Sequence, residues 1–438
     1  MKKIKEKLLN SDLIFLITGI IFFFIMLNIP VISDDAVRIE GLKGSRDLRD
    51  IWNYAMIFFK GEAASDSRIL IILPAVFFAA YPRFVWAAFM ALCMFVILKA
   101  LSLIFPSGHK MLQAVLITLS VLSYKYSILS SAGWITTMCA YFSPMAFGIL
   151  TLVPLRKLAD KEAVKRSSCL LYALALIYSS NSEQIMLFQM LCGISFLIFL
   201  RIRDKKFYFY PALMICICMA SAFFTLLSPG NTARIKREVI YFPFFMRMDG
   251  VNKFELGFDT AAYLFGESGR LWFLLACIFM TVLIFKKYKN VFFRAGALLL
   301  LIFSVCGTGL PQMLIHRIPY FTMIPAGGLF QAGATGPHTF IKFFILILIL
   351  VLFLEGIILS AGSMETLLLM LSLYAGGFAS RVILGFAPSI YTSGERSAAT
   401  MDFCTIAICA GLIGEMLARQ GDDSVLLPAQ KKNDQIRQ

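Results

Sequence analysis

The chain has 438 residues, of which 59% are hydrophobic, and its mean hydropathy is +0.79. Soluble domains are roughly 45–50% apolar, so this composition excludes an ordinary soluble globule and predicts a membrane protein built from many spans. A formal charge of +15 would suggest nucleic-acid binding in a soluble protein. Multi-spanning proteins, however, carry Lys and Arg in their cytoplasmic loops, and we therefore expect no nucleic-acid partner.

The first apolar run, residues 13–32, follows the basic segment MKKIKEKLLN. It is too long for a secretory signal and lacks a small-residue cleavage site, so we expect a retained span whose N-terminus is cytoplasmic. The polar C-terminal residues 419–438 are predicted to form a disordered cytoplasmic tail. Residues 1–418 are predicted to form a single membrane domain.

Hydropathy and basic punctuation together predict an all-α polytopic membrane protein with about twelve transmembrane helices. The basic runs RKLADKEAVKR, RIRDKK and KKYKN recur at intervals of two spans, as an alternating topology with both termini inside requires. The predicted spans are 13–32, 83–105, 110–128, 134–154, 168–180, 184–200, 208–227, 270–285, 292–312, 340–360, 365–384 and 400–418.

Two further segments follow the first span. In DLRDIWNYAMIFFK, residues 47–60, the apolar side chains recur on one helical face, which predicts a helix lying on the outer membrane surface. The segment ILIILPAVFFAAY, residues 69–81, is too short to cross alone at ~1.5 Å per residue. We expect it to dip into the membrane or to extend the next span.

The unusual polar residues at the span ends fall mostly on the predicted outer side. The topology was derived from hydropathy and positive charge, so their gathering on one side predicts a single extracytoplasmic site. The candidate residues are Asp34, Asp35, Arg38, Trp134, Asn181, Glu183, Asn231, Arg234, His316, Arg317, Glu395 and Arg396.

The adjacent carboxylates Asp34 and Asp35 stand directly after the first span. A carboxylate at the membrane surface can take a proton from an attacking hydroxyl, and two together can share a divalent cation with diphosphate oxygens. The alternative is an ordinary solvated loop. Glu183 interrupts an apolar stretch in NSEQ, which marks either a site or an ion pair that joins two spans.

Arg234 lies on the predicted outer face, where the positive-inside rule disfavours basic residues. Outer arginines fit a phosphate clamp, because the guanidinium fork matches phosphate oxygens, although some will be counter-ions of the acidic residues. A lone histidine such as His316 is more often structural than a metal ligand, and no metal-ligand spacing surrounds it, so it is a candidate for substrate binding only. The chain has no Walker-type loop and no Gly-rich nucleotide fingerprint, so we expect an activated donor to be a lipid.

The ordered stretches SDD, GWITTMCAYFSP, NSEQ, SPGNTAR and GFASRVILGFAPSIYTSGER resemble the GT-C superfamily of membrane glycosyltransferases, and more closely bacterial families related to GtrII-type glucosyltransferases. The resemblance implies a membrane helical bundle with jaw-like outer helices at 47–60 and 241–265. It implies that Asp34 or Asp35 is the catalytic base, that Arg234 and Arg396 lie near the lipid phosphate, and that Glu183 and Asn231 line the sugar pocket. Ala36 and Val37 stand where many relatives carry an aromatic residue, and the chain has no C-terminal soluble domain, which leaves the acceptor open.

The resemblance and the residues together predict transfer of a sugar from a polyprenyl-phosphate donor to an envelope glycan, lipid or protein, at the outer face of a bacterial inner membrane. A divalent cation is the one cofactor considered. The alternatives are an envelope polysaccharide polymerase or ligase, and a lipid or solute transporter. A transporter would place polar residues at mid-bilayer and show repeated halves.

Overall fold

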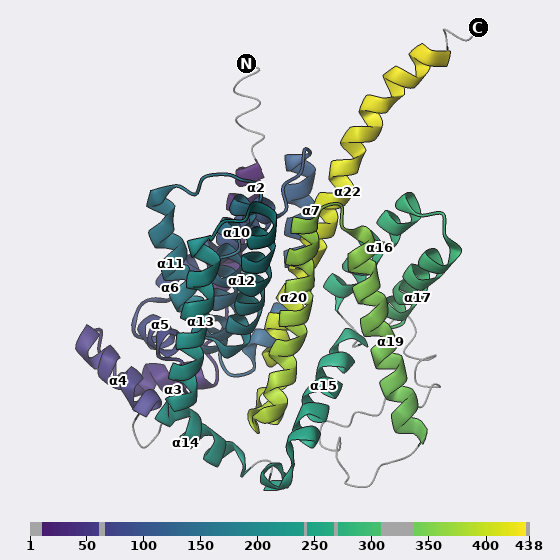
Figure 1. Ribbon diagram of the computed structural model, residues 1–438. Helices are drawn as coiled ribbons and strands as arrows, with labels where there is room; N and C mark the ends of the chain where they lie inside the picture. Colours follow the sequence, from purple (N-terminus) through teal and green to yellow (C-terminus); the bar gives the residue numbers. More distant parts are fainter. Residues whose placement is uncertain (1–10, 61–65, 241–242, 267–269, 308–336, 435–438) are drawn as a thin grey trace.

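The computed structural model describes the chain except residues 1–10, 61–65, 241–242, 267–269, 308–336 and 435–438. Every regular element in the described part is a helix, as Figure 1 shows. The predicted all-helical class is therefore confirmed for these residues. Most of the long helices run side by side in a bundle, and the helices are labelled in Figure 1.

Each of the twelve predicted spans coincides with a helix. In chain order these are α2 (Ser11–Leu27), α6 (Arg83–Ile104), α7 (Lys110–Leu122), the run Trp134–Ala159, α11 (Arg166–Ser180), α12 (Glu183–Asp204), α13 (Phe209–Leu227), α16 (Leu271–Lys287), α17 (Val291–Gly307), α19 (Pro337–Ser360), α20 (Met364–Val382) and α22 (Ala399–Asp434).

Six helices in the described residues are long and apolar enough to cross a membrane. They are α6, the run Trp134–Ala159, α12, α13, α20 and the segment Gly394–Ala418, which contains the start of α22. Others, such as α2 and α7, are apolar but shorter. A membrane protein with several spans is thus supported, and the count of twelve stays a prediction.

Helix α2 has large apolar side chains on its exposed face. Its residues Leu16, Ile20 and Phe24 are each about half exposed, whereas Phe15 and Phe22 pack into the core. A row of exposed large apolar side chains is unfavourable in water and normal against acyl chains. The helix therefore shows one face to the bundle and one to the surroundings that a bilayer would supply.

The run Trp134–Ala159 consists of α8 (Trp134–Thr137), the π-helical turn η2 (Met138–Phe142), α9 (Ser143–Leu150) and α10 (Val153–Ala159). We call it the 134–159 helix. Pro144 has no N–H to donate to the preceding turn, and the wider π-turn accommodates that missing bond without ending the helix. The π-turn follows directly after the helix N-terminus, where several candidate residues lie.

Short helices gather at the end of the bundle opposite to the start of α2 and the C-terminal part of α22 (Figure 1). They are α3 (Asp34–Gly41), α4 (Leu48–Lys60), α14 (Pro229–Glu238), α15 (Gly250–Gly266), α21 (Ser389–Ser393), η1 (Tyr126–Ser130), η3 (Pro243–Arg247), η4 (Ile383–Phe386) and η5 (Gly394–Ala398). Helices were expected at 47–60 and 241–265, where α4 and α15 are found. We call this region the α3 end of the bundle.

The short apolar helix α5 (Ile69–Ala80) is separate from α6. At its start, the Leu70 N–H donates to Asn181 Oδ1 over 3.0 Å, and just past its end the Tyr81 hydroxyl donates to Arg46 O over 3.3 Å. Asn181 lies in the α11–α12 turn and Arg46 lies between α3 and α4, both at the α3 end. Both ends of helix α5 therefore bond to segments at the α3 end, and its dipping into the membrane stays a prediction.

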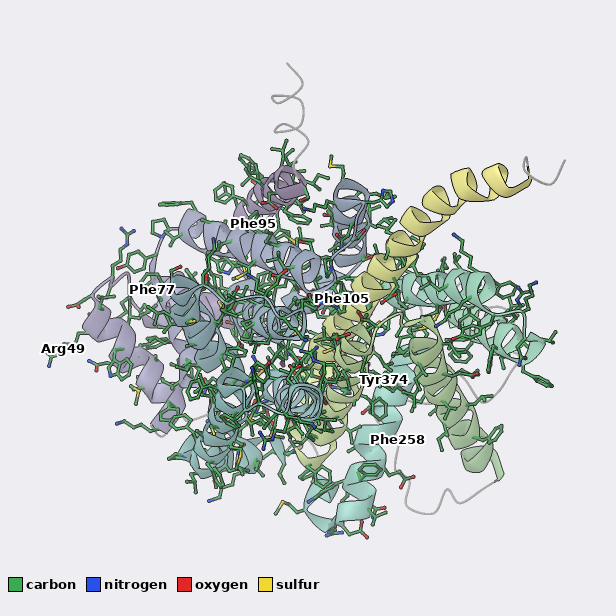
Figure 2. The ribbon with its side chains drawn as sticks, turned by 45° about the horizontal axis from the view of Figure 1, so that its top comes forward. Arg49, Phe77, Phe95, Phe105, Phe258 and Tyr374 are labelled. Atoms are coloured by element: carbon green, nitrogen blue, oxygen red, sulfur yellow. The ribbon has the colours of Figure 1, made fainter. Side chains whose placement is uncertain are left out.

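The amphipathic helix α4 buries Ile51 and Ala55 against α5 and exposes Trp52. Figure 2 shows Arg49 at the outer edge of α4, pointing away from the bundle.

At the other end of the chain, α22 continues to Asp434 and so covers residues 419–434, which were expected to be a disordered tail. Extending an existing helix is cheap compared with starting one, and this segment continues a helix that the core already holds.

Candidate functional site

Asp35 is the N-terminal cap of the 134–159 helix. Its carboxylate is 1% exposed and accepts hydrogen bonds from the backbone N–H of Ile135 at 2.8 Å and of Thr136 at 2.9 Å. The first N–H groups of a helix have no partner within the helix, and the helix dipole favours a negative charge beside them. The second aspartate of the pair is therefore occupied in holding the end of a neighbouring span.

Gly133 allows this close approach. Its φ is +93°, a conformation that side chains disfavour, and a Cβ atom there would lie 2.5 Å from Asp35 Oδ1. The glycine of GWITT is therefore required for the contact between the first loop and the 134–159 helix. The sequence contained this signal as a Gly directly before the helix start, but the carboxylate that faces it could not be identified from spacing.

Arg38 and Asp35 are joined through one hydroxyl. Thr136 Oγ1 donates to Asp35 Oδ1 over 2.8 Å and accepts a hydrogen bond from the Arg38 guanidinium. The guanidinium also lies over the Phe58 ring, 5.3 Å from its centroid. Arg38 Nε is buried and makes no hydrogen bond within the described residues. Arg38 is thus fixed in orientation while retaining unused donors.

Asp34 differs from Asp35 in exposure and in hydrogen bonding. Its side chain is exposed and makes no hydrogen bond or ion pair within the part of the chain that the structure describes. Asp34 and Arg38 are four residues apart in α3, which places them on one side of that helix. Trp134, the first residue of the 134–159 helix, is partly buried next to this group. The α3 end therefore offers an open carboxylate close to a fixed guanidinium.

A second charged group lies where α5 begins. The Arg68 guanidinium donates to both carboxylate oxygens of Asp66, over 2.7 and 2.8 Å, and Ser67 Oγ donates to Glu183 Oε1 over 3.0 Å. Glu183 is thereby held at the start of α12, close to the Arg68 charge that it stabilises. Glu183 therefore joins the start of α12 to the segment before α5 through the Ser67 hydroxyl, and no ion pair of Glu183 with an arginine occurs among the described residues.

The electrostatics of this second group favour the charged forms. Burial by itself raises the pKa of Asp66, but the charge and hydrogen bonds of Arg68 and the charge of Arg234 outweigh it and leave that pKa below its usual value. Burial opposes the charge of Arg68 as well, yet Asp66 and Glu183 raise its pKa well above the usual value. Asp66 and Arg68 therefore both stay ionised at neutral pH.

Helix α14 brings Arg234 to the same place. Arg234 Nε donates to Glu238 Oε1, one turn later in the helix, over 2.9 Å. A Cβ atom on Gly230 would lie 2.1 Å from the backbone oxygen of Asp66, so the start of α14 packs directly on the segment before α5. Asn231 is partly exposed on the same helix. Arg234 keeps further N–H donors beyond its bond to Glu238.

The C-terminal candidates join the site through η5. The Arg396 guanidinium donates to Ser131 Oγ over 3.1 Å, next to the start of the 134–159 helix. Gln184 donates to the backbone oxygens of Ser397 (2.6 Å) and Ser380 (3.2 Å), which fixes η5 against α12 and α20. Glu395 is exposed in η5. The candidate residues of the last loop therefore lie at the α3 end with the first-loop residues.

The end of α4 lies between the two charged groups. Phe58 carries Arg38 on its ring, and its backbone oxygen accepts a hydrogen bond from the N–H of Asp66 over 3.2 Å. The structure therefore brings together Asp34, Asp35, Arg38, Trp134, Asn181, Glu183, Asn231, Arg234, Glu395 and Arg396 at one end of the bundle. His316 and Arg317, also predicted, lie outside the described residues.

Besides Arg234–Glu238, sequence reasoning missed two further ion pairs among the described residues at this end. One is Asp66–Arg68, and the other is the fully buried pair of Arg270 with Asp402, in which Arg270 also lies 5.5 Å from the centroid of the Trp272 ring. A signal for the second was present, because Asp402 is an acidic residue inside a predicted span and such residues usually have a partner. Its partner, directly before α16, could not be identified without the fold.

No group of three or more His, Cys, Asp or Glu side chains suited to a metal ion occurs among the residues that the structure describes. Asp35, the more buried of the two aspartates, directs both of its oxygens to the 134–159 helix. A divalent cation shared by the two aspartates therefore has no support in this geometry, and the cation remains a prediction.

Comparison with protein families, with curated proteins and with solved structures finds no match for this chain. The likeness to GT-C enzymes accordingly rests on the short ordered motifs alone.

Proposed function

We propose that this protein is a membrane glycosyltransferase that moves a sugar from a polyprenyl-phosphate donor to an acceptor hydroxyl at the α3 end of the bundle. One observation carries the proposal: the exposed carboxylate of Asp34 lies one helical turn before Arg38 in α3, and the Arg38 guanidinium is held by Thr136, which in turn bonds to the buried Asp35. A base and a phosphate-binding cation at the end of a membrane bundle are the two groups that transfer from a lipid phosphate needs.

Asp34 is the base in this proposal. Its exposed carboxylate takes the proton from the acceptor hydroxyl as the hydroxyl oxygen forms a bond to the anomeric carbon of the donor sugar. The bond between the anomeric carbon and the phosphate oxygen breaks, and the lipid phosphate leaves with that electron pair. Asp35 is a positioning residue, because its three accepted hydrogen bonds leave it committed to the 134–159 helix.

Arg38 is the first candidate to stabilise the departing phosphate, since its guanidinium is oriented by Thr136 and Phe58 and keeps unused donors. Arg234 and Arg396 are second candidates. Arg234 donates a hydrogen bond to Glu238 and Arg396 donates one to Ser131, and each guanidinium has further N–H donors. These three arginines come from three separate segments, which suits a phosphate that must be approached from several sides.

The proposed location is a bacterial cytoplasmic membrane, with the α3 end facing outward and both termini in the cytoplasm. Two observations support this orientation. The basic runs of the sequence fall at the other end of the predicted spans. Helix α2 begins, and the C-terminal part of α22 leaves the bundle, at the end opposite to α3 (Figure 1).

The test uses purified protein in vesicles supplied with a panel of undecaprenyl-phosphate hexoses and an envelope glycolipid fraction as acceptor, with release of undecaprenyl phosphate as the readout. Asp34→Asn is expected to lower turnover by about 10²–10⁴-fold, the range of a lost general base, with unchanged thermal stability. Glu40→Gln, an exposed acidic position on the same helix, is the matched control. Full turnover in both Asp34→Asn and Arg38→Gln would exclude this site.

A transporter is the second candidate, and the buried pair of Arg270 and Asp402 is the observation that favours it, because buried charges in membrane bundles often mark a transport path. Both residues, however, lie at or within one turn of the start of α16 and α22 rather than at mid-helix. Lipid or sugar movement across vesicles without release of lipid phosphate would favour the transporter over the transferase.

A further inference from the structure

A cavity of about 450 Å³ lies at the end of the bundle opposite to the α3 end. This is the end at which α2 begins and α22 leaves the bundle. It opens between the ends of α6 and α16, the start of α20, and the flanks of α10 and α22. The polar side chains that line it are Arg156, Lys287, Ser363, Thr366 and Glu415. Phe105, which Figure 2 shows beside α22, and Pro106 form an apolar part of its wall.

Its two cations are fixed in position by bonds that leave donors unused. Lys287 Nζ donates to the backbone oxygens of Leu359 and Ala361, over 3.0 and 3.2 Å, at the end of α19. An ammonium has three N–H bonds, so one remains. The Arg156 guanidinium donates to Thr366 Oγ1 over 3.1 Å and to Asp160 over 2.7 Å, which leaves further N–H groups.

The third charged group, Glu415, has the opposite sign and no partner within the described residues. A Cβ atom on Gly362 would lie 2.2 Å from Glu415 Oε2, so the carboxylate rests directly on the turn between α19 and α20. Lys287 holds the same turn through Ala361, yet the two side chains form no ion pair. The cavity therefore has a cationic side, where Lys287 has no carboxylate partner among the described residues and Arg156 is ion-paired with Asp160, and an anionic side at Glu415.

This charge arrangement selects among ligands. A purely anionic group would be attracted by Lys287 and Arg156 but repelled by Glu415. A purely cationic group would be attracted by Glu415 but repelled by Lys287 and Arg156. A zwitterion with a phosphate and an ammonium satisfies all three. The cavity lies at the end of membrane helices with apolar residues in its wall, which suits a lipid whose head group enters while its chains stay outside.

We propose that this cavity binds the phosphoethanolamine head group of a membrane phospholipid, with the phosphate on Lys287 and Arg156 and the ammonium on Glu415. The inference does not depend on the proposed glycosyl transfer. The Ser363 and Thr366 hydroxyls at the start of α20 supply further polar contacts for the phosphate oxygens.

The test is native mass spectrometry of the full-length protein in detergent with added dioleoyl phosphatidylethanolamine, dioleoyl phosphatidylglycerol or inorganic phosphate. Wild type is expected to retain phosphatidylethanolamine in preference to phosphatidylglycerol. Lys287→Gln should weaken that retention about ten-fold, the effect of losing one charged hydrogen bond. Lys286→Gln, the exposed neighbour that does not line the cavity, is the matched control and should behave as wild type.

Glu415→Gln supplies an independent arm, because this side chain makes no bond within the described residues and its replacement should leave folding intact. It should abolish the preference for phosphatidylethanolamine and raise retention of phosphatidylglycerol. Equal losses in Lys286→Gln and Lys287→Gln would overturn the proposal, as would an unchanged lipid preference in Glu415→Gln. Binding of inorganic phosphate without retention of either lipid would overturn it in favour of a soluble anion.

Discussion

The two adjacent aspartates should separate stability from activity when each is replaced in turn. Asp35→Ala removes a carboxylate that accepts two backbone N–H bonds and one hydroxyl bond at the start of the 134–159 helix. Asp34→Ala removes an exposed side chain that makes no bond within the described residues. The substitution is chemically the same at both positions, so the difference between them reports the environment alone.

The magnitude follows from what each change leaves behind. Loss of a helix cap costs about 0.5–2 kcal/mol. Each buried donor left without an acceptor costs about 1–3 kcal/mol. Asp35→Ala removes the acceptor of the buried Ile135 N–H and of the partly buried Thr136 N–H and hydroxyl. We therefore expect Asp35→Ala to lower the free energy of unfolding by about 3–5 kcal/mol, allowing for partial relaxation. Asp34→Ala, at an exposed site, should change it by less than about 0.5 kcal/mol.

The assay is thermal unfolding of the purified protein in detergent, followed by tryptophan fluorescence and by the fraction that stays monodisperse after heating. The apparent melting temperature of Asp35→Ala should fall by several degrees, while that of Asp34→Ala should match wild type. Turnover should show the reverse dependence, with Asp34→Ala inactive although folded. Equal destabilisation by the two variants would refute the division of roles, and so would full activity of folded Asp34→Ala.

Three further predictions follow from the same structure. Gly133→Ala should lower the free energy of unfolding by about 2–4 kcal/mol, because the φ of residue 133 is positive and a Cβ there would collide with the Asp35 carboxylate. Gly108→Ala is the control in the same melting assay and should be neutral, because a Cβ at residue 108 has no heavy atom within 4 Å. Asp66 has a folded-state pKa below its usual value of 3.8, so its contribution is complete above about pH 3.8 and is lost as the pH falls further; melting curves from pH 6 to 3 should show an acid-side loss that is smaller in Asp66→Asn. Arg270→Ala should cost about 3–5 kcal/mol, because it removes the guanidinium that pairs with the buried Asp402 carboxylate. The double change Arg270→Met with Asp402→Leu should recover part of that loss, and a double variant no more stable than the single one would contradict the pairing.

Much of the bundle could be predicted from hydropathy, because burial in lipid demands long apolar helices and basic residues mark the ends that stay in the cytoplasm. Every predicted span coincides with a helix, and the amphipathic period of residues 47–60 correctly located α4. The period did not predict which apolar residues of α4 pack against protein. Ile51 and Ala55 pack against α5, whereas Trp52, on the same predicted apolar face, is exposed.

The candidate site shows what sequence reasoning could not reach. The motif SDD contains two aspartates that are equivalent by residue type and by distance from the span, and nothing in the spacing separates them. Their roles differ because α3 turns one carboxylate onto the helix that begins a hundred residues later, beside Gly133, and leaves the other exposed. Likewise no sequence motif marks Asp66 and Arg68, because the segments that pack on them, α14 and the start of α12, are distant in sequence.

The sequence by itself determined that this chain is a helical membrane protein whose unusual polar residues collect at one end, because hydrophobic length and charge bias act locally along the chain. The tertiary structure decided which of those residues are tied up in caps and ion pairs and which remain open for chemistry. That decision depends on the partners supplied by segments distant in sequence, and hydrogen bonds of a few ångströms are set by packing rather than by local pattern.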